Sequence, residues 1–276
     1  MSGVYLGTSP YAAAILQRLA GTPHGPALVI TRPDRPAGRG RRVASPPVAD
    51  VARELGIALL QPEDLGAPEV RERIGAAAGY VVVCAYGVLI REPLLSEYPM
   101  LNVHPSLLPR WRGAAPIERA IMAGDAQTGV SIMRLTEGLD SGPVCLSAIE
   151  PIRPDDTFGS LSERLEALGG DLLLRALEED LPFVAQDEGG VTYAEKITAA
   201  DRLLDPAMSA AQRERIVRAL HPHLGARLAL ADGELLGVLR AHAQGDRLML
   251  DEVRPAGGAP MAFEDFARGR PALAAA

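Results

Sequence analysis

Short apolar runs alternate with amphipathic stretches through the first 190 residues of the chain. Residues 79–85 are almost continuously apolar, as expected for a strand buried on both faces. Apolar residues at three- and four-residue spacing separate several of these runs and predict helices. We expect strands at 4–6, 27–31, 79–85, 101–104 and 130–135, and helices at 11–19, 47–56 and 158–181. This alternation predicts βα units around a mostly parallel sheet.

The clearest predicted helix covers residues 158–181, where one apolar stripe recurs at helical spacing. Asp155, Asp156 and Thr157 precede it, and each is a suitable N-cap or first-turn residue. The polar, glycine-containing segment 186–190 then predicts a domain boundary. After it, a helix at 211–220 leads into β-like runs at 227–231, 235–241 and 247–253. Asp232-Gly233 predicts a hairpin turn, so a small antiparallel unit should follow the larger α/β domain.

Composition excludes several classes of protein. No run approaches the roughly 18 apolar residues of a membrane-spanning helix, and the N-terminus lacks the basic and apolar regions of a secretory signal. The two cysteines, Cys84 and Cys145, lie in apolar strand-like runs, which favours buried thiols in a cytoplasmic protein. His221 and His223 flank a proline, and a loop is the better interpretation because no third ligand lies nearby. We therefore expect no metal.

The formal net charge of −7 arises within residues 151–188, which contain three Arg and ten acidic residues. The rest of the chain is balanced, so the acidic total does not exclude an RNA partner. Residues 32–42 carry five Arg and one Asp. Such a loop is usually a solvated surface, but the guanidinium group of Arg can also donate two parallel hydrogen bonds to a phosphate or a base edge.

Candidate chemistry is concentrated in residues 101–117. On a strand, Asn102 and His104 share one face, and Pro105 ends the strand where open α/β sheets place their ligands. Spacing alone is equally compatible with a buried, hydrogen-bonded histidine that has no catalytic role. Asp140 lies between Gly138 and Gly142 after a predicted strand, so its loop can approach a substrate. By itself it would be interpreted as an ordinary turn aspartate.

Together these segments resemble a known family. The residues that carry the resemblance are the run 102–113 (Asn-Val-His-Pro-Ser-Leu-Leu-Pro-Arg-Trp-Arg-Gly), Leu-Asp-Ser-Gly at 139–142, and Gly7-Thr8. The chain resembles the 10-formyltetrahydrofolate-dependent formyltransferases, and within them the methionyl-tRNA formyltransferases. The resemblance implies a Rossmann-like formyltransferase domain over residues 1–188, a linker over 189–204, and a small OB-like β-barrel domain over 205–276. Two departures are a shortened C-terminal domain and Leu204-Asp205-Pro206 where the family usually has Asp-Trp.

The resemblance also implies an activity, formyl transfer from 10-formyltetrahydrofolate to an amine. Such acyl transfer needs donors aimed at an oxyanion and a group that moves protons. We expect Asn102 and His104 to donate to the oxyanion and Asp140 to assist proton transfer. The turn Ser106, Leu107, Leu108 and Pro109 is expected to cradle the folate, or merely to shape the pocket.

For the acceptor, the resemblance implies initiator methionyl-tRNA. Contacts are expected from Arg35, Arg39, Arg41 and Arg42 in the basic loop, and from Lys196, the only lysine of the chain. A sugar or small-molecule formyltransferase is the alternative within the fold, and a non-catalytic RNA-binding protein is the alternative outside it. We expect a monomer that contacts no membrane.

Overall fold

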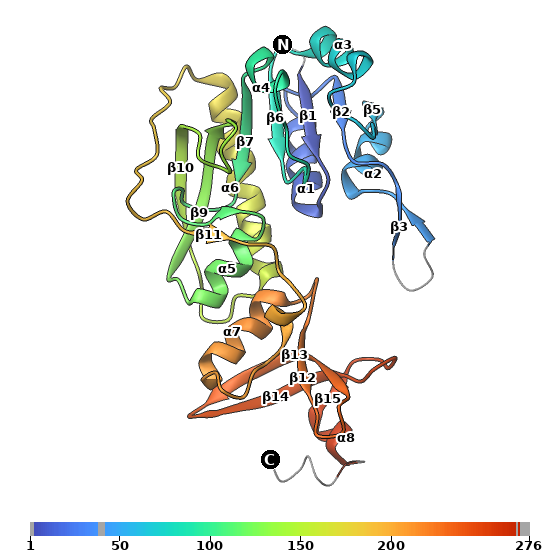
Figure 1. The fold of residues 1–276 in the computed structure, drawn as a ribbon, viewed down its shortest axis with the longest axis vertical. Helices are drawn as coiled ribbons and strands as arrows, with labels where there is room; N and C mark the ends of the chain where they lie inside the picture. The colour runs from blue at the N-terminus through green and yellow to red at the C-terminus, as the bar shows by residue number, and fades with distance from the viewer. Residues whose placement is uncertain (1–2, 38–41, 269, 271–276) are drawn as a thin grey trace. The chain divides into compact units, whose positions relative to one another are not determined.

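A computed structural model describes residues 3–37, 42–268 and 270 of the chain. Packing divides the chain into two compact units, drawn in Figure 1. The first comprises Met1–Ala114, Gly129–Glu150 and Glu163–Tyr193, and the second comprises Ala115–Thr128, Pro151–Ser162 and Ala194–Ala276. The division into a domain at 1–188, a linker and a domain at 205–276 stays a prediction.

A seven-stranded sheet forms the centre of the first unit, in the order β10-β9-β7-β6-β1-β2-β5. The pairs β1–β2, β1–β6, β2–β5 and β6–β7 are parallel, and β9 runs antiparallel to β7. The mostly parallel sheet predicted from the sequence is therefore confirmed. Its strands are β1 (Val4–Gly7), β2 (Leu28–Ile30), β5 (Ala58–Leu60), β6 (Val81–Cys84), β7 (Met100–His104), β9 (Gln127–Arg134) and β10 (Val144–Pro151).

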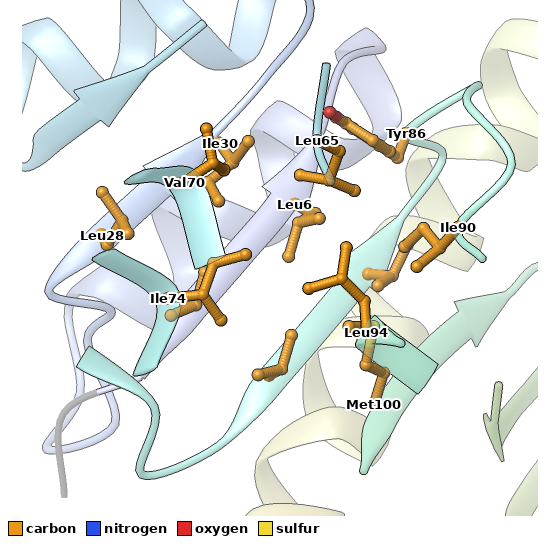
Figure 2. Packing of buried hydrophobic residues seen from close by; sticks show 13 residues of the cluster. Leu6, Leu28, Ile30, Leu65, Val70, Ile74, Tyr86, Ile90, Leu94 and Met100 are labelled. Carbon is orange, nitrogen blue, oxygen red and sulfur yellow. The ribbon is translucent and has the colours of Figure 1, made fainter. Parts of the chain in front are cut away.

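One face of this sheet is covered by α3 (Pro68–Ala77) and α4 (Leu94–Glu97). Alternate strand residues point to this face, among them Leu6 of β1 and Ile30 of β2, and both are fully buried. Figure 2 shows how they pack with Ile74 of α3 and Leu94 of α4. Helix α3 was not predicted, because it buries only two residues, Val70 and Ile74, and so carries little apolar periodicity.

The opposite face carries α1 (Pro10–Ala20) and the main part of α6 (Phe158–Glu178). Tyr5 points to this side from β1, and its hydroxyl donates to the carbonyl of Ala12 over 2.7 Å. The hydroxyl of Tyr11 donates to the carbonyl of Leu165 in α6 over 3.2 Å. A Cβ at Gly169 would lie only 3.0 Å from the Tyr11 hydroxyl oxygen. A glycine is therefore what lets α6 approach α1 this closely.

Side chains cap the starts of two helices: Thr157, before α6, was expected from the sequence, and Ser9, before α1, was not. The Oγ1 of Thr157 accepts from the backbone N–H of Ser160 over 3.2 Å, so Thr157 caps α6. The Oγ of Ser9 caps α1 in the same way, by accepting from the N–H of Ala12. Five further short elements are β3 (Arg35–Ala37), β4 (Arg42–Ala44), α2 (Pro47–Glu54), β8 (Arg112–Gly113) and β11 (Tyr193–Ala194).

A four-stranded antiparallel sheet, ordered β12-β13-β14-β15, characterises the second unit. Its core is built from α7, β12 and β13, with Val217, Leu220 and Val238 among its buried residues. The predicted small antiparallel unit is confirmed, while its closure into an OB-like barrel stays a prediction. Its elements are α5 (Pro116–Ala123), η1 (Ala200–Arg202), α7 (Ala210–Leu220), β12 (Ala226–Ala229), β13 (Leu235–Gln244), β14 (Arg247–Arg254), β15 (Met261–Ala262) and α8 (Phe263–Arg268).

Among the described residues, no helix combines the length and the apolar character that crossing a membrane requires. Both cysteines are free thiols, Cys84 fully buried in β6 and Cys145 half-buried in β10. Burial raises the pKa of the Cys84 thiol to about 12. That thiol therefore stays protonated at neutral pH and packs as a small apolar side chain.

Candidate active site

Asn102 and His104 lie at the carboxyl end of β7 on the same face of the strand. Both are buried, with relative exposures of 8% and 4%. Asn102 is also the only asparagine among the 276 residues, a signal visible in the composition alone. A buried amide needs partners for its polar atoms, and the nearest side chain comes from a different part of the chain.

That side chain is Asp140, in the connection between β9 and β10. Its Oδ1 accepts from Nδ2 of Asn102 over 3.5 Å, a long hydrogen bond. Its Oδ2 lies 3.6 Å from Nδ1 of His104 and accepts from the backbone N–H of Gly113 over 2.8 Å. The three side chains predicted from separate segments therefore meet in one place.

The second ring nitrogen of His104 defines its tautomer. Nε2 lies 2.9 Å from the backbone carbonyl oxygen of Trp111. A carbonyl oxygen can only accept, so Nε2 carries a proton in this arrangement. Nδ1 faces the carboxylate of Asp140. The ring is therefore held by one hydrogen bond, from Nε2 to the carbonyl of Trp111, while the 3.6 Å between Nδ1 and the Asp140 carboxylate is an ion-pair contact longer than a hydrogen bond.

The Asp140 loop adopts a constrained backbone. Asp140 itself has φ of 44°, in the left-handed region that few residues other than glycine adopt. A Cβ on Gly142 would collide with the backbone carbonyl of Arg134, so only glycine fits there. The amide of Gln186 then donates from Nε2 to the carbonyls of Asp140 and Gly142, both over 2.8 Å.

Sequence reasoning missed three of these partners. Trp111 and Gly113 act through backbone atoms, which side-chain patterns do not reveal, although both lie within the segment singled out as dense. Gln186 was interpreted only as part of a polar boundary segment. The structure places its side chain against the Asp140 loop instead.

The turn from Ser106 to Pro109 is held by hydrogen bonds within the protein. Oγ of Ser106 donates to the carbonyl of Arg110 over 2.6 Å. Oγ of Ser131 donates to the carbonyl of Ser106 and accepts from the N–H of Leu108, at 2.8 and 3.2 Å. These bonds define a rigid turn next to His104. Its expected role as a folate cradle is a proposal.

The residues expected to contact tRNA are distributed over both units. Arg35 lies in β3 with an exposed side chain, 3.5 Å from the carboxylate of Glu63. Arg42 begins β4, while Arg39 and Arg41 lie outside the described residues. Lys196 is exposed in the second unit.

The part of the chain that the structure describes contains no group of three or more His, Cys, Asp or Glu side chains arranged for a metal ion. His223 instead forms a 3.0 Å contact with the carboxylate of Glu118, and its ring stacks on Phe158.

Comparison with known proteins shows the family of the chain. The family model described as Formyl transferase matches residues 3–177. The chain is 42% identical over 296 aligned residues to the methionyl-tRNA formyltransferase of Halorhodospira halophila, covering 97% of this chain and 96% of the relative.

Solved structures show the same fold. The methionyl-tRNA formyltransferase of Clostridium thermocellum superposes with a TM-score of 0.66 at 14% identity, over 92% of this chain and 98% of that one. An N-formyltransferase from Helicobacter canadensis, in complex with folinic acid and dTDP-3-aminofucose, also gives 0.66 at 14% identity, over 95% and 99% of the two chains. By the match to the family model and the identity to its curated relative, the chain belongs to the formyl transferase family.

Proposed function

We propose that the protein transfers the formyl group of 10-formyltetrahydrofolate to the amino group of initiator methionyl-tRNA. The observation that carries this proposal is the meeting of Asn102, His104 and Asp140 at the carboxyl end of β7. The 42% identity to a methionyl-tRNA formyltransferase over nearly the whole chain supports the choice of acceptor.

The reaction defines what the site must supply. The lone pair of the neutral methionyl amine attacks the formyl carbon and forms a C–N bond, and the carbonyl electrons move to oxygen. The tetrahedral intermediate then collapses, the bond from carbon to folate N10 breaks, and N10 takes up a proton as the amine loses one. The site therefore needs a donor for the oxyanion and a proton carrier between the two nitrogens.

Asn102 suits the first task. Its Nδ2 carries two N–H donors, and the bond that it makes to Oδ1 of Asp140 is a long one of 3.5 Å. Burial of the amide keeps water from competing for those donors. A hydrogen bond from Asn102 to the formyl oxygen would strengthen as negative charge develops on that oxygen, and it would therefore lower the barrier to reaction.

His104 and Asp140 suit the second task as a pair. Nε2 of His104 is taken by the carbonyl of Trp111, so the ring would reach the oxyanion through Nδ1, which lies 3.6 Å from the Asp140 carboxylate without a hydrogen bond to it. A proton on Nδ1 can be donated to the oxyanion, and Asp140 can accept the amine proton and pass it toward N10, directly or through water. No covalent intermediate with the enzyme is required.

The formyl donor would lie against the turn of Ser106, Leu107, Leu108 and Pro109. Fold relatives support a folate in such a site, since one solved N-formyltransferase contains folinic acid and a sugar formyltransferase contains 5-N-formyl-THF. Because the N–H of Leu108 and the carbonyl of Ser106 are already hydrogen-bonded within the chain, the turn would act mainly through its rigid shape.

Initiator tRNA would be held by Arg35, Arg39, Arg41 and Arg42, with a further contact from Lys196. Four Arg side chains on one short segment suit the closely spaced phosphates of an RNA stem. This role in translation initiation would place the protein in the cytoplasm, acting as a monomer on one tRNA.

One assay tests the whole proposal. Purified protein is mixed with 10-formyltetrahydrofolate and initiator methionyl-tRNA, with dTDP-3-aminofucose in equimolar competition. We expect formyl-methionyl-tRNA to form and the sugar to remain unmodified. Preferential formylation of the sugar would assign the chain to a sugar formyltransferase, and no transfer to either amine would refute the activity.

A further inference from the structure

Gln186 uses every polar atom of its side chain beside the candidate active site. Its two N–H groups donate to the carbonyls of Asp140 and Gly142, each over 2.8 Å. Its Oε1 accepts from Nε of Arg112 over 3.0 Å. A primary amide has two donors on nitrogen and an acceptor oxygen. Among the long side chains, only glutamine carries this combination.

Arg112 orients that amide. Its side chain is 5% exposed, and its Nη2 lies 3.7 Å from the carboxylate of Glu188. Because a guanidinium can only donate, it forces the oxygen of the Gln186 amide toward itself. The nitrogen of the amide must then face the two carbonyls of the Asp140 loop.

The segment that carries Gln186 is itself anchored to the sheet. Val184 and Val144 exchange backbone hydrogen bonds of 2.8 and 2.9 Å, which attach the segment to β10. Further along, Oγ1 of Thr192 accepts from the N–H of Trp111 over 2.9 Å. The segment is therefore fixed on both sides of Gln186, and the amide acts from a rigid base.

The Asp140 loop needs such support. A non-glycine residue at φ of 44° lies in a disfavoured backbone region and persists only where its surroundings impose it. The two carbonyls held by Gln186 belong to Asp140 itself and to the residue two positions later. They bracket the turn that aims the Asp140 carboxylate at Asn102 and His104.

We propose that Gln186 is a positioning residue for formyl transfer, which holds the Asp140 carboxylate against Asn102 and His104 by clamping the backbone on both sides of Ser141. This proposal rests on the proposed function, because its kinetic test measures formyl transfer. Displacement of a catalytic group by about 1 Å costs about a hundredfold in rate, so the clamp should act on kcat rather than on substrate affinity.

The decisive variant is Gln186→Glu, which keeps the side-chain length and can still accept from Arg112. It replaces the two N–H donors by an oxygen that repels both carbonyls. Gln17→Glu, on the exposed surface of α1, makes the same chemical change away from the site and serves as the control. Asp140→Ala and the double variant Gln186→Glu/Asp140→Ala complete a double-mutant cycle.

We expect Gln186→Glu to lower kcat about ten- to a hundredfold, with KM for the formyl donor within about twofold of wild type. In the Asp140→Ala background the same change should cost less than about threefold, because the group it positions is gone. The proposal would be overturned if the loss of kcat in the double variant equalled the product of the losses in the two single variants. A wild-type kcat in Gln186→Glu would overturn it as well.

A second measurement does not depend on activity. Amide hydrogen exchange in peptides covering residues 137–143 should accelerate in Gln186→Glu and stay unchanged in Gln17→Glu. Unaltered exchange in that loop would contradict the clamp even if the wild-type protein formylates tRNA. A wild-type protein that formylates neither amine, with the loop nevertheless released in Gln186→Glu, would refute the proposed function and leave the clamp standing.

Discussion

At the level of single residues, the candidate site combines three side chains whose partners come largely from the backbone. His104 lies between the carbonyl of Trp111 and the carboxylate of Asp140, and Asp140 is also held by the N–H of Gly113. Backbone groups move little, so they fix the orientation of both side chains before a substrate arrives. Preorganisation of this kind is the main source of electrostatic catalysis.

Asn102→Ala tests the oxyanion donor. Loss of one donor costs about 3 kcal/mol, so kcat should fall about a hundredfold or more while KM for tRNA changes little. Asn102→Asp removes the donors without changing the shape, and it adds a second carboxylate next to Asp140. It should be at least as inactive as Asn102→Ala. Steady-state formylation kinetics give both values, and an Asn102→Ala enzyme within about threefold of wild type would exclude the proposed role.

The candidate residues were predictable from sequence to the extent that side chains carry the signal. Asn102 and His104 share a strand face by simple alternation, and Asp140 is marked by its flanking glycines. Nothing in the spacing shows that Gln186 returns to the site from a position 46 residues beyond Asp140. That contact depends on the path of a segment without regular structure, which periodicity does not predict.

At the level of secondary structure, strong apolar patterns were predicted well and weak ones were missed. The buried strand β6 and the amphipathic helix α6 lie where their patterns indicated. Helix α5 begins at Pro116, beyond the strand and turn predicted at 101–109, where no helix was predicted. Its eight residues contain four buried ones but are too few to establish a helical period against the preceding prolines and glycine.

An ion pair joins α5 to η1 within the second unit. Oδ1 of Asp201 accepts from Arg119 over 2.7 Å, and Oδ2 accepts from the N–H and hydroxyl of Thr198 over 2.8 and 2.7 Å. The hydrogen bond from Arg119, helped by Thr198, lowers the pKa of Asp201 to about 2. Because the folded pKa lies below that of the unfolded chain, the stabilisation is present above about pH 4 and is lost as the pH falls toward 2.

Asp201→Asn should therefore lower the free energy of unfolding by about 1 kcal/mol at neutral pH. The difference from wild type should be the same at pH 7 and pH 5 and smaller at pH 3, because the carboxylate of the unfolded wild-type chain, with its ordinary pKa near 4, is mostly protonated there while the folded one is not. Urea unfolding at the three pH values measures it. Asp246→Asn, at the exposed tip of the β13–β14 hairpin, removes the same charge and should change stability little. A pH-independent difference for Asp201→Asn would contradict the assigned cause.

At the level of the whole molecule, charge is segregated along the chain. The acidic excess lies in residues 151–188, while the segment 32–42 carries a net positive charge in a protein whose total is −7. Attraction of RNA by the molecule as a whole would therefore be weak, and the proposed tRNA binding would depend on a few local Arg–phosphate contacts. Such binding has a salt dependence proportional to the number of contacts rather than to net charge.

We expect a measurable salt dependence of tRNA binding from the basic segment 32–42. Each phosphate contact contributes about 0.9 to the slope of log affinity against log salt concentration for a duplex. The double variant Arg39→Gln/Arg41→Gln should therefore raise KM for tRNA, reduce the salt slope of kcat/KM by about 2, and leave KM for the formyl donor unchanged. Arg73→Gln/Arg175→Gln removes two positive charges from α3 and α6. If net charge governed binding, both double variants would weaken tRNA kinetics equally. A selective effect of the first pair would show instead that an acidic protein recruits RNA through one short basic segment.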